Sequence, residues 1–166
     1  GADELAITTS IWIAISTIAS ALEFGDRNKV VMSELDFPTD GHVWLANAKR
    51  GVEIEWLRSP DGLTIPLEEY DRAIDERTAV VMVNRVLYRS SAIVDAKEVC
   101  RIARERGALS FLDDYHGIGI VPLDPLENEV RSRRVGATAW DLEGQRALQA
   151  GDAPAAVKAF RKALEA

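Results

Sequence analysis

Short apolar runs rich in β-branched residues alternate with longer helical stretches from residue 4 to about residue 124. The predicted strands cover residues 5–8, 30–33, 53–57, 79–83 and 109–112. The predicted helices cover residues 11–24, 43–50, 67–74 and 95–106. Short apolar strands that are separated by helices indicate a parallel sheet with helices on both faces. The alternation therefore predicts an α/β fold with three α/β/α layers and a mainly parallel sheet of five strands.

Beyond residue 125 the composition changes to helix-forming residues, chiefly Ala, Leu, Glu, Lys and Arg, with no strand pattern. A Gly-Asp pair interrupts this stretch, and Pro154 suits the first turn of a further helix. We therefore expect a helical hairpin of residues 137–150 and 154–165. The spacing of its small and large residues resembles one tetratricopeptide repeat, although a plain amphipathic hairpin fits as well. The predicted domains are an α/β domain, 1–125, and a helical extension, 126–166.

The net charge of −7 disfavours binding to nucleic acid or to an anionic membrane. Residues 5–22 are apolar but include six Thr or Ser, so neither a signal peptide nor a membrane span is predicted. The one cysteine, Cys100, cannot form an internal disulfide, so we expect a core position and a reducing compartment such as the cytoplasm. His42 and His116 are the only histidines, and the sequence predicts no metal site.

The run FLDDYHGIG, residues 111–119, ends an apolar strand with Asp113 and Asp114. Two carboxylates at the end of a buried strand are costly unless a partner or a ligand uses them. This run, with LAITTS, DRNKVVMSELDFPTDGHVW, RGVEIEWL and residues 77–109, resembles the large domain of class V aminotransferase-like enzymes. The resemblance implies the fold-type-I architecture and the cofactor pyridoxal 5′-phosphate, and it is strongest to kynureninases and cysteine desulfurases.

The resemblance also implies roles for individual residues. In this family an aspartate at the strand end keeps the pyridine nitrogen of the cofactor protonated, and Asp113 matches that position. His116 matches a side chain beside the cofactor, and Phe37 matches an aromatic residue that stacks on its ring. Thr9 and Ser10, at the start of the first helix, match the region that holds the phosphate. Sites of this family lie near dimer interfaces, so a homodimer is an expected partner.

Three departures from the family pattern argue against catalysis. The Schiff-base lysine that the family carries downstream of the aspartate has no counterpart, because Ala139 stands near its place. Ile11 and Trp12 replace small hydroxyl residues at the phosphate helix, and we expect both to be buried there. Asn84 and Arg85 stand where relatives often carry small or imidazole side chains near the cofactor, and Arg85 is a predicted partner of the two strand-end aspartates.

These departures favour a family derivative without catalytic function, and the repeat-like tail suggests an engineered chimera. A second hypothesis is a kynureninase-like or cysteine desulfurase-like lyase or aminotransferase whose site another subunit completes. A third is a binding module that acts through the helical hairpin. The family's strand order, 3-2-4-5-6-7-1, includes two strands without a counterpart here. We therefore expect strand 5–8 to pair beside strand 109–112, in the order 3-2-4-5-1.

Overall fold

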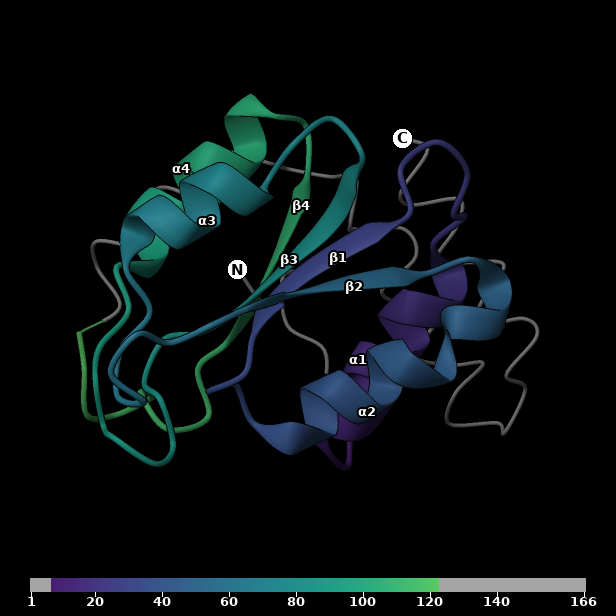
Figure 1. Cartoon of the computed structure of the whole chain (residues 1–166). Coiled ribbons are helices and arrows are strands. Elements are labelled where there is room, and N and C mark those ends of the chain that lie inside the picture. The colour runs from purple at the N-terminus through teal and green to yellow at the C-terminus, as the bar shows by residue number, and fades with distance from the viewer. Residues whose placement is uncertain (1–6, 123–166) are drawn as a thin grey trace. The chain divides into compact units, whose positions relative to one another are not determined.

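Residues 7–122 are described by the structure, a computed structural model of the chain (Figure 1). They fall into two compact units that divide between Glu23 and Phe24. The first unit contains helix α1 (Ile11–Ala21). The elements of the second unit are β1 (Lys29–Ser33), α2 (Pro38–Ala46), the 3-10 helix η2 (Ala48–Arg50), β2 (Glu53–Leu57), α3 (Leu67–Ala73), β3 (Thr78–Asn84), α4 (Ala96–Glu105) and β4 (Leu109–Asp113). The predicted α/β class is confirmed.

The second unit is built on a parallel sheet with the strand order β2-β1-β3-β4 (Figure 1). The two central strands are almost entirely buried, which agrees with their continuous apolar sequence. All strands run the same way, so their carboxyl ends lie along one edge, where Asn84 of β3 pairs with Asp113 of β4. We call this the carboxyl edge and the opposite one the amino edge. The predicted relative order of these four strands is confirmed.

The fifth predicted strand, residues 5–8, is only partly covered by the described residues. Residues 5 and 6 lie outside the described residues, while Ile7 is outside any strand and 95% exposed. Thr8 donates its hydroxyl hydrogen bond to the Ser10 carbonyl, and the Ser10 hydroxyl accepts one from the Ile13 amide. These residues therefore form the N-terminal cap of α1, which competes with extended pairing. The described sheet has four strands, and the fifth predicted strand with its pairing beside β4 is not confirmed.

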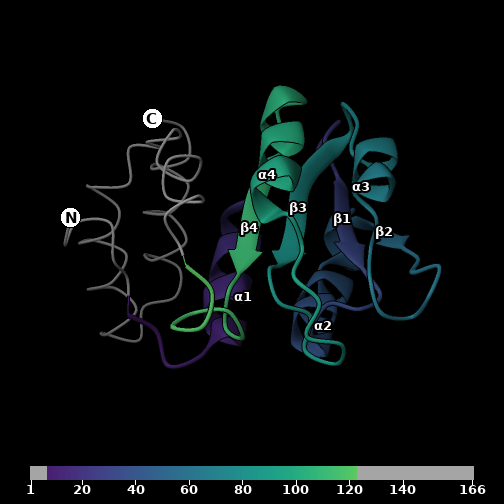
Figure 2. The same cartoon turned by 90° about the vertical axis from the view of Figure 1, so that its left-hand side faces the viewer.

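Helices lie on both faces of the sheet (Figure 2). Helices α3 and α4 pack side by side on one face, over a core that includes Val31, Val81 and Val83. Helix α2 lies on the opposite face, where a Cβ atom on Gly41 would come within 2.8 Å of the Trp56 ring. The backbone of α2 therefore approaches β2 closely because residue 41 lacks a side chain.

Helix boundaries follow local capping chemistry. The Asp95 carboxylate accepts a hydrogen bond from the Glu98 amide and begins α4, and Gly107, with φ of +74°, follows its end. Helix α2 begins at Pro38, five residues before the predicted start at residue 43, because proline suits the first turn of a helix. Residues 48–50 continue as the 3-10 helix η2 and not as part of α2.

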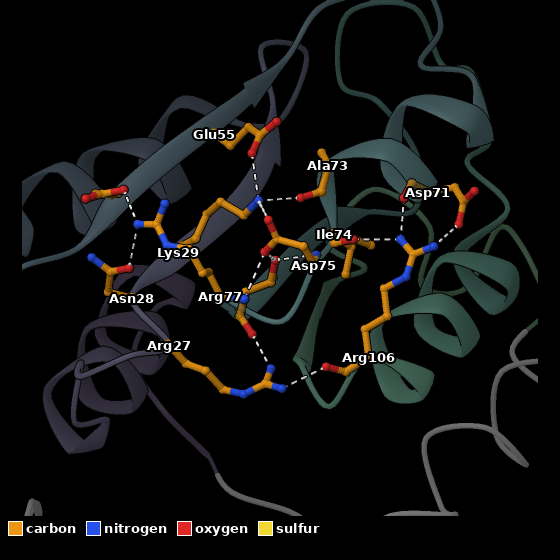
Figure 3. Close-up of polar contacts among 12 residues, drawn as sticks. Arg27, Asn28, Lys29, Glu55, Asp71, Ala73, Ile74, Asp75, Arg77 and Arg106 are labelled. Carbon is orange, nitrogen blue, oxygen red and sulfur yellow. Dashed lines mark hydrogen bonds and ion pairs between the residues drawn. The ribbon is translucent and has the colours of Figure 1, made fainter.

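A network of ion pairs and hydrogen bonds occupies the amino edge (Figure 3). The buried Lys29 ammonium donates to Glu55 at 2.8 Å, to Asp75 at 2.8 Å and to the Ala73 carbonyl at 2.6 Å. Arg77 binds Glu53, and Arg106 binds Asp71 and two carbonyl oxygens of the α3 segment. This network ties β1 to β2 and to the connection between α3 and β3.

Burial agrees with one further sequence prediction and contradicts another. Cys100 is buried on α4, as expected. Trp12 is 55% exposed, so the prediction of its burial was wrong; α1 instead buries Ile15, Ala19 and Ala21.

The predicted tail hairpin and the predicted boundary between domains 1–125 and 126–166 lie outside the described residues. Within residues 7–122, no helix is long and apolar enough to cross a membrane.

Candidate functional site

The carboxyl edge of the sheet holds Asp113, the last residue of β4. Asp113 is 4% exposed, and its Oδ1 accepts a hydrogen bond from the Tyr115 amide at 2.9 Å. Within residues 7–122, Asp113 has no cation as a partner. The strand end therefore presents a buried carboxylate that accepts a hydrogen bond from a backbone amide but has no cation beside it in the described part of the chain.

Two more buried carboxylates lie after β1: Asp36 in the connection to α2, and Asp40 in the first turn of α2. Asp36 Oδ2 accepts from the Ser33 amide at 2.7 Å, and Asp40 Oδ2 accepts from the Asn84 side-chain amide at 2.7 Å. The Oδ1 atoms of both aspartates are buried and have no hydrogen-bond partner in the described part of the chain. The carboxyl edge thus gathers three acids around one neutral amide.

Burial and neighbouring negative charge raise the pKa of Asp36 and of Asp40. Burial raises the pKa of Asp36 to about 7, and the charge of Asp40 adds to that effect. Burial likewise raises the pKa of Asp40 to about 6, with a further contribution from Asp113. Loss of water disfavours the charged carboxylate, and a neighbouring like charge disfavours it again. Perturbed acids that converge on one edge of a parallel sheet are typical of functional sites.

Aromatic side chains lie beside these acids. The ring of Phe37 is 5.2 Å from that of Tyr88 and 5.9 Å from that of His116, between centroids. Tyr88 and His116 are 6.4 Å apart, with their planes tilted by 32°. The predicted site residues Phe37 and His116, from loops far apart in the sequence, are therefore brought together. Tyr88 joins them, although the sequence analysis did not identify it.

Arg85 has the partner that the sequence analysis anticipated. Its Nε and Nη2 donate to the two carboxylate oxygens of Asp114, at 2.6 and 2.7 Å. The side chains are only 4% and 13% exposed, so this is a buried two-point ion pair. Because Asp114 takes the guanidinium, Arg85 does not neutralise Asp113.

Thr9 and Ser10 belong to the first unit, where both are exposed at the start of α1. The Ser10 hydroxyl already serves as the helix cap, since it accepts from the Ile13 amide at 3.3 Å. Their predicted contact with a phosphate stays a prediction.

An apolar cavity of about 230 Å³ borders the aromatic side chains. Its lining includes Phe37, Tyr88, Met32 and Trp56. Among residues 7–122, no group of three or more His, Cys, Asp or Glu side chains is arranged to hold a metal ion. The unpartnered acids and flat rings instead fit a protonated aromatic nitrogen heterocycle, which supplies both the missing positive charge and a face for stacking.

None of the described lysines is paired with Asp113. Lys29 is held at the amino edge by Glu55 and Asp75. Lys49, in η2, and Lys97, in the first turn of α4, are exposed. Within residues 7–122, none of these three ammonium groups forms an ion pair or hydrogen bond with Asp113.

Sequence reasoning did not identify Asp36 or Asp40 as members of the site, and it noted Asn84 only as a departure from the family pattern. A signal existed, because each follows or ends a predicted strand, and the ends of parallel strands converge. Their burial, however, depends on how the β1–α2 connection folds back over β3, and single-sequence patterns do not contain that information.

Comparison with known proteins supports a cofactor-binding fold. Residues 6–130 match the family described as aminotransferase class-V. The uncharacterized aminotransferase YcbU of Bacillus subtilis is 35% identical over 125 residues, which cover 75% of this chain and 33% of that protein. A kynureninase of Burkholderia mallei is 31% identical, over 86% of this chain and 34% of its own length. The chain thus spans about a third of the length of these relatives.

The kynureninase similarity extends beyond the α/β region. A share of 86% of this chain is about 143 residues, which exceeds the 125 residues that precede the predicted tail. The match therefore continues into that tail. The likeness of the tail to a tetratricopeptide repeat and the engineered origin both stay predictions.

Two solved structures show the same fold. A mutant of the cystine C-S lyase C-DES, with glycine linked to its pyridoxal-phosphate cofactor, superposes with a TM-score of 0.67 at 13% identity. The superposition covers 76% of this chain and 35% of the C-DES chain. The apo cysteine desulfurase of Thermococcus onnurineus gives a TM-score of 0.59 at 21% identity, over 69% of this chain and 30% of its own.

Proposed function

Because the chain belongs to the aminotransferase class-V family, we propose that its carboxyl edge binds the ring of pyridoxal 5′-phosphate. The observation that carries this proposal is Asp113, a carboxylate that is 4% exposed and has no cationic partner among residues 7–122. A buried acid in that state is costly in the free protein, and a protonated pyridine nitrogen would relieve the cost.

Each residue of the site has a distinct role in this proposal. Asp113 accepts the hydrogen bond of the protonated ring nitrogen and keeps its proton in place. Phe37 and His116 contact the ring and exclude water from it. When bound, the cofactor supplies an electron sink for carbanion chemistry.

The reaction of this family needs a lysine beside the cofactor, and no lysine among residues 7–122 is paired with Asp113. The chain by itself then binds the cofactor without turnover. Lyase or aminotransferase activity of the kynureninase or cysteine desulfurase kind requires a lysine from outside these residues. A second subunit is the proposed source, and a homodimer is the simplest such assembly.

Calorimetric titration of the full chain tests the binding proposal. We use pyridoxal 5′-phosphate and also pyridoxine 5′-phosphate, whose alcohol cannot react with surface lysines. Asp113→Asn keeps an oxygen for the Tyr115 amide but removes the charge. We expect about 10- to 100-fold weaker binding, the usual value of one charge-assisted hydrogen bond. Asp26→Asn, at an exposed acid before β1, serves as the control. Equal affinity of the wild-type and Asp113→Asn proteins contradicts the proposal.

A further inference from the structure

Two consecutive polar side chains are buried where β3 ends. Asn84 is 1% exposed and Arg85 is 3% exposed. Strand β3 lies between β1 and β4 in the sheet, so its end lies between the segments that follow those two strands. One segment, residues 34–37, carries Phe37 and is called the Phe37 loop. The other, residues 114–122, carries His116 and is called the His116 loop.

Asn84 binds the Phe37 loop and the first turn of the helix after it. Its Oδ1 accepts a hydrogen bond from the Phe37 amide at 3.0 Å. Its Nδ2 donates to Asp40 Oδ2 at 2.7 Å. Both ends of one side-chain amide are therefore satisfied by groups on either side of Pro38, which fixes the backbone from which the Phe37 ring projects.

Arg85 binds the His116 loop at both of its ends. At the beginning of the loop, Nε and Nη2 bind the Asp114 carboxylate at 2.6 and 2.7 Å. At the end, Nη1 donates to the Pro122 carbonyl at 2.8 Å and Nη2 to the Val121 carbonyl at 3.0 Å. One planar guanidinium thus closes the loop on itself, a geometry that a lysine ammonium cannot reproduce.

Gly117 gives independent support for this reading of Arg85. A Cβ atom at residue 117 would lie 2.1 Å from Asp114 Oδ1 and 3.0 Å from Arg85 Nη2. The residue directly after His116 must therefore lack a side chain for the ion pair to form. By contrast, a Cβ atom on Gly25 would have no heavy atom within 4 Å.

We propose that Asn84 and Arg85 are positioning residues that jointly set the separation of the Phe37 and His116 rings, and thereby the shape of the ring-binding site. The inference rests on the proposed function for the identity of the ligand, but the placement of the two rings is independent of it. A change at Arg85 releases His116, and a change at Asn84 releases Phe37.

Nuclear magnetic resonance of the full chain tests the placement without any ligand. In the wild-type protein, we expect aromatic cross-peaks between Phe37 and His116, whose centroids are 5.9 Å apart, and slow solvent exchange of the Arg85 Nε proton. Rapid exchange of that proton overturns the inference in the wild-type protein, whatever the variants do.

Arg85→Lys and Gly117→Ala test the same contact from its two sides. Both are expected to weaken the Phe37–His116 cross-peaks while the β1–β2 amide signals stay unchanged. The matched controls are Arg89→Lys, at an exposed arginine, and Gly25→Ala. Asn84→Ala is expected to shift the Phe37 ring signals and to leave the Arg85 Nε proton protected. Folded variants that keep all of these signals overturn the inference.

Titration with pyridoxine 5′-phosphate then connects placement to binding. We expect about tenfold weaker affinity for Arg85→Lys and for Asn84→Ala, because a displacement of a contact residue by about 1 Å is sufficient for such a loss. If the wild-type chain does not bind this compound, the proposed function fails while the ring cross-peaks still decide the positioning role. If binding is unchanged in variants that have lost the cross-peaks, the positioning role is refuted and the proposed function stands.

Discussion

The two edges of the sheet differ in whether their buried charged side chains have partners of opposite charge. At the amino edge, the Lys29 ammonium lies between Glu55 and Asp75, with Nζ–O distances of 2.8 Å (Figure 3). It donates its third hydrogen bond to the Ala73 carbonyl. At the carboxyl edge, burial raises the pKa of Asp36 and of Asp40, with further contributions from Asp40 to the first and from Asp113 to the second. One oxygen of each of these two acids has no partner within residues 7–122. At the amino edge Lys29 is paired with acids, whereas at the carboxyl edge Arg85 is taken by Asp114 and leaves Asp36, Asp40 and Asp113 without a cation among residues 7–122.

This difference suggests that the charged residues of the two edges have different roles. The amino edge has paired its charges, so its polar groups hold β1, β2 and the α3–β3 connection together. The carboxyl edge retains unpaired acids, although natural sequences rarely leave buried polar groups without partners. Such a cluster persists where a ligand supplies the missing partner. We therefore assign stability to the first edge and binding to the second.

Removal of Lys29 should produce the largest loss of stability. Lys29→Met leaves Glu55, Asp75 and the Ala73 carbonyl without their shared donor. The two acids are each about 40% exposed, so water compensates them in part. We expect the free energy of unfolding in urea to fall by about 3 kcal/mol, near the lower end for a broken buried pair. Lys49→Met, at an exposed lysine, should change it by less than about 0.5 kcal/mol. Equal effects at both sites would contradict the structural role of the amino edge.

Neutralisation of Asp36 should stabilise the protein, but only at higher pH. The folded-state pKa of Asp36 is about 7, against 3.8 for an ordinary aspartate, so the folded state binds the proton more tightly. The stability that this group contributes is complete below pH 3.8 and is lost as the pH rises through about 7. Asp36→Asn should therefore raise the free energy of unfolding by about 2 kcal/mol at pH 8 and by little at pH 4. Denaturant titrations at both pH values measure this, and a uniform destabilisation refutes it.

Removal of one hydroxyl beside Asp75 and of one near Asp36 should give smaller effects that still distinguish the two edges. Thr78 Oγ1 accepts from the Asp75 amide at 2.9 Å and donates to Asp75 Oδ1 at 3.1 Å, so Thr78→Val should cost about 1–2 kcal/mol. The Tyr70 hydroxyl is buried without a partner in residues 7–122, and Asp36 contributes to the raised pKa of Tyr70. Tyr70→Phe should change stability by less than about 0.5 kcal/mol. Thermal unfolding compares the two variants, and the reverse order of effects is the contradictory outcome.

The sequence predicted the parts of the fold that depend on local pattern. Residues 53–57 form a strand with the predicted bounds, and Asp95 caps α4 as expected, because apolar runs and capping residues act within a few positions of themselves. Residues 5–8 also have a strand-like composition, yet Thr8 and Ser10 turn the chain into a helix cap. Short-range hydrogen bonds there compete with strand pairing, and composition does not show which of them wins.

The site was predictable only where a motif carries its chemistry. Asp113, His116 and Phe37 were recognised through family-like motifs, and the structure brings the rings of Phe37 and His116 to 5.9 Å. Asp36 and Asp40 were missed, because the sequence around an aspartate does not show whether its carboxylate is buried or exposed. The Lys29 network was missed for the same reason, since its partners come from β2 and from the α3–β3 connection.

The central claim is that the two edges have different functions, and chemical-shift mapping with pyridoxine 5′-phosphate tests it most directly. Amide and aromatic signals of the full chain are followed as the compound is added. We predict saturable shifts at Phe37, Asn84, Asp113 and His116, and no shifts at Lys29, Arg77 or Arg106. Shifts centred on the amino edge, or no saturable shift at the carboxyl edge, would contradict the account.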